Sequence, residues 1–314
     1  MAPEEIWPNF FIAGARKCGT TSLYFYLKRI PGIYMSPIKE LFYFAPHAVQ
    51  TDAFDVIRDK KEYLRLFEKA RGHTVVGEAT PGYLWDPDAP KLIHQTVSDA
   101  RIIMILRDPI ERAYSQYLQS VKYGGIKSSF YDELMRDYKS QEKLYGPSQL
   151  YVEMGMYYEQ VKRYFDIFGR EQVKVIIFEE FVQHLAQTVN EVMAFLGVNY
   201  TVTADMMEHY NPDSVPRSRL SRLVFAFFRC LRARNIKFYK LLVLLPDSVV
   251  KSLPEKILFK RTHKPKIDPK ALEFLQEIYH DDVLRLESLL GRSLPWPTVL
   301  SNKNNNGSVE SSGV

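Results

Sequence analysis

The stretch FFIAGARKCGTTSLYFYL, residues 10–27, decides the fold prediction. It opens with a short apolar run that ends at Gly14, and residues 20–30 then carry apolar side chains at helical spacing. Pro31 and Gly32 follow as a stop signal for that helix. The pattern predicts a buried strand, a glycine-containing turn and a helix.

The turn in this stretch has the residues of an anion-binding loop. Gly14 and Gly19 keep the spacing of the G-x-x-x-x-G-K-[ST] loop of nucleotide-binding proteins, but Thr20 stands where the lysine belongs and Lys17 precedes the second glycine. Backbone N–H groups and the helix dipole favour an anion at such a turn. Lys17 adds a positive charge, and Thr20 and Thr21 add hydroxyl donors. On spacing alone, an ordinary strand-to-helix turn with a capping threonine stays open.

Strands and helices alternate along the rest of the chain. Apolar runs predict further strands at 73–78, 101–108 and 173–178, and periodic segments predict helices within 86–97, 109–124, 156–168, from 178 to Leu196, and 269–290. This alternation predicts an α/β fold, a three-layer P-loop-like architecture with a central parallel sheet flanked by helices.

Composition and length limit the classes of protein that fit. The chain has 314 residues, 46% of them hydrophobic, which is enough for one large core. Its net charge of +5 is modest, so general nucleic-acid binding is not expected. Two cysteines, Cys18 and Cys230, are too few for a disulfide framework or a zinc site.

The organisation that we expect is a single domain over residues 1–300 followed by a disordered tail at 301–314, which is small, polar and low in complexity. The segment at about 217–261 mixes apolar clusters with many arginines and lysines, and we expect a helical insertion or lid there. The N-terminus lacks a signal-peptide pattern, and the apolar runs after position 220 are shorter than a membrane span. We therefore expect a cytoplasmic protein, with peripheral membrane contact through 217–245 left open.

A second stretch, LRDPIERAYSQY at 106–117, carries a candidate phosphate site. Arg107 lies at the carboxyl end of a predicted buried strand, and Ser115 follows two turns into the next helix. Ligands of open α/β sheets bind at the carboxyl ends of strands, and an arginine fork suits a phosphate. Alternatively, Arg107 and Asp108 pair with each other or cap the helix.

Together these stretches resemble the sulfotransferase family that uses 3'-phosphoadenosine 5'-phosphosulfate (PAPS) as donor. RKCGTTSL is similar to the 5'-phosphosulfate loop of that family, and RDPIERAYS to its 3'-phosphate signature R-D-P-x-x-R-x-x-S. PGIYMSPIKELFYF is similar to the segment carrying K-E-x-x-[FY]-F, and GEATPGYL to the E-x-[ST]-P-x-Y motif. KRTHKPKID resembles the basic substrate-side loop of heparan-type members, without the glycine after its first lysine. The resemblance covers roughly residues 9–296.

The resemblance implies sulfuryl transfer from PAPS to the hydroxyl of a carbohydrate, glycolipid or other alcohol, with adenosine 3',5'-bisphosphate (PAP) as product. Lys17 is the candidate cation at the leaving oxygen, and Glu40 is the implied base. A loop lysine without an acidic metal ligand beside it suits transfer without a metal. Lys39 and Tyr83 are expected on the acceptor side. The expected donor contacts are Arg16, Lys17, Cys18, Gly19, Thr20, Thr21, Ser22, Arg107, Ser115, Lys260 and Arg261.

Several alternatives stay open at this point. Glu40 has neighbouring lysines with which it can pair, and Ala79 stands where heparan-type members carry a lysine. Cytosolic members use a histidine base, for which His47 and His94 are the candidates. A degenerate P-loop kinase or NTPase would use Asp108 as its magnesium-binding acid. A non-catalytic, membrane-associated nucleotide-binding protein would use the basic segment against anionic lipid.

Overall fold

The computed structural model describes residues 5–51, 55–122, 126–206 and 265–300, and the backbone of 214–216 and 259–261. The predicted lid lies almost entirely outside these residues, and the predicted tail lies wholly outside them. Within the described residues, no helix is both long and apolar enough to cross a membrane.

Five parallel strands form the central sheet in the order β2-β3-β1-β4-β5. The strands are β1 (Phe10–Gly14), β2 (Ile33–Met35), β3 (Val75–Ala79), β4 (Arg101–Leu106) and β5 (Val173–Ile177). Phe10 pairs with Gly77 of β3 on one side and with Arg101 of β4 on the other. All five residues of β1 are buried, as expected for a strand covered on both faces. A separate antiparallel pair joins β6 (Ser214–Pro216) to β7 (Phe259–Arg261).

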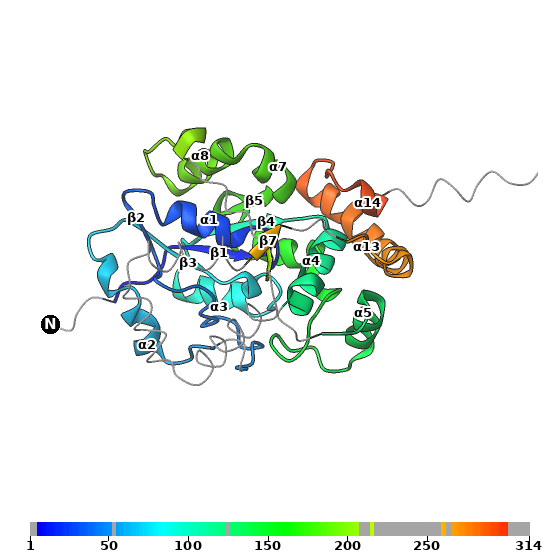
Figure 1. The fold of residues 1–314 in the computed structure, drawn as a ribbon. Helices are drawn as coiled ribbons and strands as arrows, with labels where there is room; N and C mark the ends of the chain where they lie inside the picture. Colours follow the sequence, from blue (N-terminus) through cyan, green and yellow to red (C-terminus); the bar gives the residue numbers. More distant parts are fainter. Residues whose placement is uncertain are drawn as a thin grey trace, which may run out of the picture.

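Helices cover both faces of the sheet (Figure 1). Figure 1 shows α1, α7 and α8 along one face and α3 along the other. Phe165 of α6 and Leu290 of α13 line one groove with Val175 of β5, and α6 also contacts α3. The α-helices are α1 (Thr20–Leu27), α2 (Lys60–Arg65), α3 (Ala89–Thr96), α4 (Pro109–Lys122), α5 (Phe130–Lys139), α6 (Tyr157–Phe168), α7 (Phe178–Gln183), α8 (Leu185–Leu196), α13 (Pro269–Leu290) and α14 (Pro297–Leu300). Short 3-10 helices are η1 (Glu68–Ala70), η2 (Pro81–Tyr83), η3 (Glu153–Gly155), η4 (Arg170–Gln172) and η5 (Ala204–Met206).

The strand order creates a switch point at the carboxyl end of β1. After β1 the chain builds β2 and β3 on one side of it, and then β4 and β5 on the other. The loops that follow β3, β1 and β4 therefore meet at one edge of the sheet, where ligands of open α/β sheets bind.

The predicted α/β architecture is confirmed, and the differences are local. The strand expected at 101–108 ends at Leu106, because Asp108 leaves the sheet and accepts hydrogen bonds from the first turn of α4. The helix expected from 178 to Leu196 is two helices that break at His184. The short strand β2 and the helices α2 and α5 were not predicted.

Candidate active site

The loop after β1 is shaped by its two glycines. A side chain at Gly14 would place its Cβ 2.4 Å from the Cβ of Leu84, so the loop packs directly on the chain that follows η2. Gly19 has a φ of +86° and precedes the first residue of α1, and a Cβ there would come within 3.1 Å of the Phe178 ring. Both the left-handed backbone and the close ring favour glycine at this position.

The start of α1 presents donors suited to an anion. The first helical turn leaves backbone N–H groups without an intrahelical acceptor, and here the ladder begins only with Leu23 N–H donating to the Gly19 carbonyl at 3.2 Å. Among the described residues, no side chain caps α1 and no acidic residue lies in its first turn. The N–H groups of Thr20, Thr21 and Ser22 and the exposed Thr21 hydroxyl therefore offer a place for a phosphate or sulfate group.

Cys18 contributes differently from the rest of the loop. Its side chain is fully buried, and its Sγ lies 3.7 Å from the Tyr157 hydroxyl. Burial raises the pKa of the thiol to about 11. The thiol therefore points into the core as a neutral packing group, which leaves only the backbone of Cys18 for the predicted donor contact.

Arg107 joins the end of β4 to the loop after β1. Its Nη1 donates to the Lys17 carbonyl at 3.4 Å, and its guanidinium lies over the Phe178 ring, 4.7 Å from the ring centroid. Its Nη2 lies 3.5 Å from Glu111 Oε2, so its acidic partner is Glu111 rather than Asp108. Ser115 lies partly buried two turns further along the chain in α4, and its contact with the donor stays a prediction.

Asp108 is a helix cap with a full set of partners. One carboxylate oxygen accepts from the N–H groups of Ile110 (2.9 Å) and Glu111 (3.1 Å), and the other accepts from the Thr298 hydroxyl. Burial raises the pKa of this carboxyl. Because both oxygens already accept hydrogen bonds, Asp108 is poorly suited to bind magnesium, and the kinase alternative loses the acid on which it depended.

The segment after β2 places Glu40 beyond the carboxyl end of β3. The Glu40 N–H donates to the Ala79 carbonyl at 2.8 Å, and the next N–H, that of Leu41, donates to Thr80 Oγ1 at 3.0 Å. Glu40 is exposed and adopts a φ of +63°. Since β3 and β1 are neighbours, this geometry puts the backbone of residue 40 at the same end of the sheet as the Lys17 loop.

Lys39 connects this segment to α1. Its Nζ donates to Thr21 Oγ1 at 2.7 Å and lies 5.8 Å from the centroid of the Tyr24 ring. Burial lowers the pKa of its ammonium, and the neighbouring Glu40 charge opposes that shift. Lys39 therefore lies between the predicted donor loop and the predicted base.

Tyr145 lies near the charged groups of both Arg16 and Glu40. The Arg16 guanidinium lies 5.7 Å from the centroid of the Tyr145 ring. Burial raises the pKa of the Tyr145 hydroxyl to about 12, while the Arg16 charge lowers it and the Glu40 charge raises it. Both charged groups are thus near one hydroxyl. Tyr145 was not predicted, because the sequence around it has no periodic pattern; Phe178 was also missed, although its place directly after a buried strand was a usable signal.

A buried carboxylate lies beneath this edge of the sheet. Glu78 is fully buried, and it accepts hydrogen bonds from Tyr63 Oη (2.5 Å), Thr80 Oγ1 (2.6 Å) and Tyr83 Oη (2.8 Å). Tyr83 itself is 0% exposed, so its side chain belongs to the core. The expectation that Tyr83 contacts the acceptor is corrected: its hydroxyl is committed to Glu78.

Glu78 is expected to make stability depend on pH between about 4.5 and 7. Burial raises its pKa to about 7, whereas the unfolded chain loses the same proton near 4.5. The folded state thus binds more protons in this window, so the free energy of unfolding falls as pH rises, by about 3 kcal/mol from this group. Urea unfolding at pH 5 and pH 8 measures the change, with Glu78→Gln as control. An equally large fall in the variant would assign the dependence to other groups.

The two histidine candidates for a base lie in structural contacts. His47 Nε2 lies 2.9 Å from Asp88 Oδ2, and the His94 ring packs edge-on against Phe168 at 5.2 Å. In the described part of the chain, one group has the spacing of metal ligands, namely His47, Asp86 and Asp88, whose ligand atoms lie within 4.8 Å of one another. Asp86 accepts from the N–H groups of the other two at 3.0 Å each, so hydrogen bonds among the three residues account for the cluster.

Lys260 and Arg261 lie in β7, where the structure describes the backbone only, so their predicted donor contacts stay predictions.

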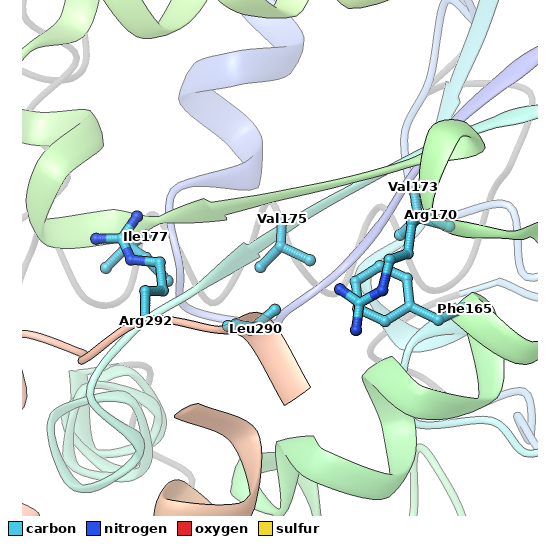
Figure 2. Close-up of a pocket in the computed structure, with 7 residues that line it drawn as sticks. All are labelled: Phe165, Arg170, Val173, Val175, Ile177, Leu290 and Arg292. Atoms are coloured by element: carbon cyan, nitrogen blue, oxygen red, sulfur yellow. The ribbon is translucent and has the colours of Figure 1, made fainter. Parts of the chain in front are cut away.

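A groove of about 220 Å³ lies along β5, apart from the predicted site residues. Figure 2 shows Leu290 near its centre and an arginine near each end. Arg170 donates to the Leu289 carbonyl at 2.7 Å, and Arg292 pairs with Glu180. Both arginines are thus engaged in packing the C-terminal segment, and we assign no ligand to the groove.

Comparison with known proteins gives a consistent result. A family model described as "Sulfotransferase domain" matches residues 8–288. The crystal structure of a sulfotransferase from Alicyclobacillus acidocaldarius is 33% identical, covers 92% of this chain and 98% of its own, and superposes with a TM-score of 0.67. Human carbohydrate sulfotransferase 15 is 25% identical over 250 residues, which are 61% of this chain and 44% of that protein. Human bifunctional heparan sulfate N-deacetylase/N-sulfotransferase 3 is 26% identical over 92% of this chain and 31% of its own length. The chain therefore spans less than half of these curated relatives.

Proposed function

Since the chain belongs to the sulfotransferase family, we propose that it transfers a sulfuryl group from PAPS to an acceptor hydroxyl and releases PAP. The observation that carries this proposal is the meeting of three segments at one sheet edge. Arg107 at the end of β4 donates to the carbonyl of Lys17, and Lys39, next to Glu40, donates to Thr21 at the start of α1. A cation next to the proposed base thus contacts the helix start, which supports the proposal of one shared site.

The donor is assigned to the loop and to the end of β4. In this proposal the N–H groups of residues 20–22 and the Lys17 ammonium hold the 5'-phosphosulfate, where the helix dipole favours negative charge. Arg107 and Ser115 hold the 3'-phosphate, and the Phe178 ring packs against the face of the Arg107 guanidinium. Lys260 and Arg261 close over the nucleotide.

The proposed chemistry is an in-line displacement at sulfur. The acceptor oxygen forms a bond to sulfur while the bond from sulfur to the bridging phosphate oxygen breaks, and the acceptor proton passes to the Glu40 carboxylate. Negative charge grows on the bridging oxygen, and Lys17 stabilises it there. Holding donor and acceptor in line supplies a further part of the rate. These steps need no metal ion.

Carbohydrate, glycolipid or another alcohol is the proposed acceptor class, with Lys39 on the acceptor side. The names of two relatives, a carbohydrate sulfotransferase and a heparan sulfate N-sulfotransferase, support this class. We expect radiolabelled sulfate from PAPS to appear in sugars or glycolipids when these are offered together with phenols. Labelling of phenols alone would refute the proposed class. Cytoplasmic location and membrane contact through 217–245 stay predictions.

PAP is expected to stabilise the protein whether or not magnesium is present. A ligand at about 100 times its dissociation constant adds about 2.7 kcal/mol to the free energy of unfolding, which is a measurable shift in melting temperature. Thermal unfolding with PAP or ATP, each with magnesium and with EDTA, makes the comparison. Stabilisation by ATP that disappears with EDTA would contradict the proposal and favour a kinase-like protein.

A further inference from the structure

The buried Glu78 carboxylate divides its two oxygens between different partners. Oε1 accepts from Thr80 Oγ1 at 2.6 Å and from Tyr83 Oη at 2.8 Å. Oε2 accepts from Tyr63 Oη at 2.5 Å. All four side chains are fully buried. Because buried polar groups are normally hydrogen-bonded, these bonds are the ones that satisfy the carboxylate and the three hydroxyls.

Two of the three hydroxyls, those of Thr80 and Tyr83, also accept a hydrogen bond from the backbone of residues 40–44, which we call the Glu40 segment. Thr80 Oγ1 also accepts from the Leu41 N–H at 3.0 Å, and Tyr83 Oη from the Phe44 N–H at 3.4 Å. When Glu78 is ionised, above its pKa of about 7, each of these hydroxyls gives its one proton to the carboxylate, so its lone pairs are left for the backbone N–H. The carboxylate therefore sets the direction of both hydroxyls.

The segment held in this way has an unfavourable backbone. Glu40 has a φ of +63° and Phe42 a φ of +54°, a region that residues other than glycine seldom adopt. Such conformations persist where surrounding contacts determine them. Here the contacts are the N–H groups of Glu40, Leu41 and Phe44, all bonded to residues 79–83.

We propose that Glu78 is a positioning residue for sulfuryl transfer. Through the Thr80 and Tyr83 hydroxyls it fixes the backbone of residues 41–44, and this holds the Glu40 carboxylate at the sheet edge facing the donor loop. The inference rests on the proposed function, in which Glu40 is the base. It accounts for the E-x-[ST]-P-x-Y pattern in this chain, because that spacing supplies the carboxylate and both hydroxyls.

The donor loop is anchored separately, which gives the proposal a distinguishing signature. The Ala15 N–H donates to the Ile105 carbonyl at 2.8 Å, and Arg107 reaches the Lys17 carbonyl from β4. We call the Thr80 and Tyr83 hydroxyls, which connect Glu78 to the Glu40 segment, the relay. Loss of the relay should therefore lower kcat for the transfer while it leaves the affinity for PAP nearly unchanged.

The test compares hydroxyl deletions that differ only in whether the hydroxyl reaches the Glu40 segment. Thr80→Val and Tyr83→Phe remove relay hydroxyls, and Tyr63→Phe is the matched control, since the Tyr63 hydroxyl bonds Glu78 through the other oxygen. We expect kcat to fall about 10-fold to 100-fold in the relay variants, as a small misplacement of a catalytic group does. Tyr63→Phe should keep kcat within about threefold of wild type. Thr80→Ser, which keeps the hydroxyl, should have the turnover that Thr80→Val loses. The affinity for PAP should change by less than about threefold in all variants.

Amide hydrogen exchange measures how firmly the backbone N–H groups of the Glu40 segment are hydrogen-bonded, and it does so independently of catalysis. The Leu41 amide should exchange faster in Thr80→Val, and the Phe44 amide in Tyr83→Phe, while Tyr63→Phe leaves both protected. Unchanged exchange at Leu41 and Phe44 in the relay variants would overturn the inference, as would an equal fall in kcat in Tyr63→Phe. A wild-type protein that binds PAP yet turns over no acceptor would overturn the proposed function, and the role of Glu78 in catalysis with it.

Discussion

Glu40→Gln is expected to lower kcat by about 10²-fold to 10⁴-fold, the usual contribution of a positioned general base. Glutamine keeps the size of the side chain and its hydrogen-bonding oxygen, but it cannot take the acceptor proton. The backbone N–H of residue 40 still donates to Ala79, so the segment should keep its position. The measurement is steady-state turnover together with the affinity for PAP, which should not change because the donor loop is a separate segment.

Glu68→Gln serves as the matched control, since Glu68 is an exposed glutamate of η1. It should leave turnover at the wild-type level. Full activity in Glu40→Gln would show that another group is the base. His47 is one of the two histidines that the sequence offered for this role. A non-catalytic binding protein would be indifferent to both substitutions.

Lys17→Met is expected to lower kcat/KM by about 10²-fold to 10³-fold, as removal of a group that stabilises developing charge does. Methionine keeps the length and apolar stem of lysine but cannot neutralise the bridging oxygen of the donor. Because the backbone at residue 17, with a φ of +69°, is equally unfavourable for both residues, stability should change little. The affinity for PAP should fall by much less than kcat/KM, since PAP lacks the sulfuryl group and the bond that breaks.

Lys28→Met is the control for charge alone, because Lys28 follows the last residue of the same helix α1. It should leave kcat/KM within about twofold of wild type. If Lys17→Met weakened PAP binding as much as it lowered kcat/KM, Lys17 would act only in ground-state binding and the assignment of transition-state stabilisation would fail.

The strand, loop and helix at residues 10–27 could be predicted because each signal is local. Continuous burial of β1 and the apolar period of α1 are written in neighbouring residues, and α13 matches its predicted bounds of 269–290 because its period runs over six turns. β2 has three residues, which is too few to show any period. α7 and α8 read as one helix, since the sequence around His184 carries neither glycine nor proline at the break.

The candidate site could be predicted as a set of motifs but not as an arrangement. The loop residues, Arg107 and Glu40 were proposed from sequence because each belongs to a recognisable motif, and their roles stay predictions. The direction of each side chain depended on the fold: Cys18 turns into the core, Tyr83 bonds Glu78, and Arg107 pairs with Glu111. Tyr145 reaches the site from a segment more than one hundred residues further along the chain than Arg16 and Glu40, a distance that no local pattern records.

The hydrogen bond from Lys39 to Thr21 links the two proposed substrate sites. Because the Thr21 hydroxyl accepts from the Lys39 ammonium, its single proton is left to donate to a donor anion. A donor bound to Thr21 and an acceptor bound to Lys39 would therefore order the same pair of side chains. We expect each substrate to change the affinity for the other, and thermodynamic reciprocity requires the same factor in both directions.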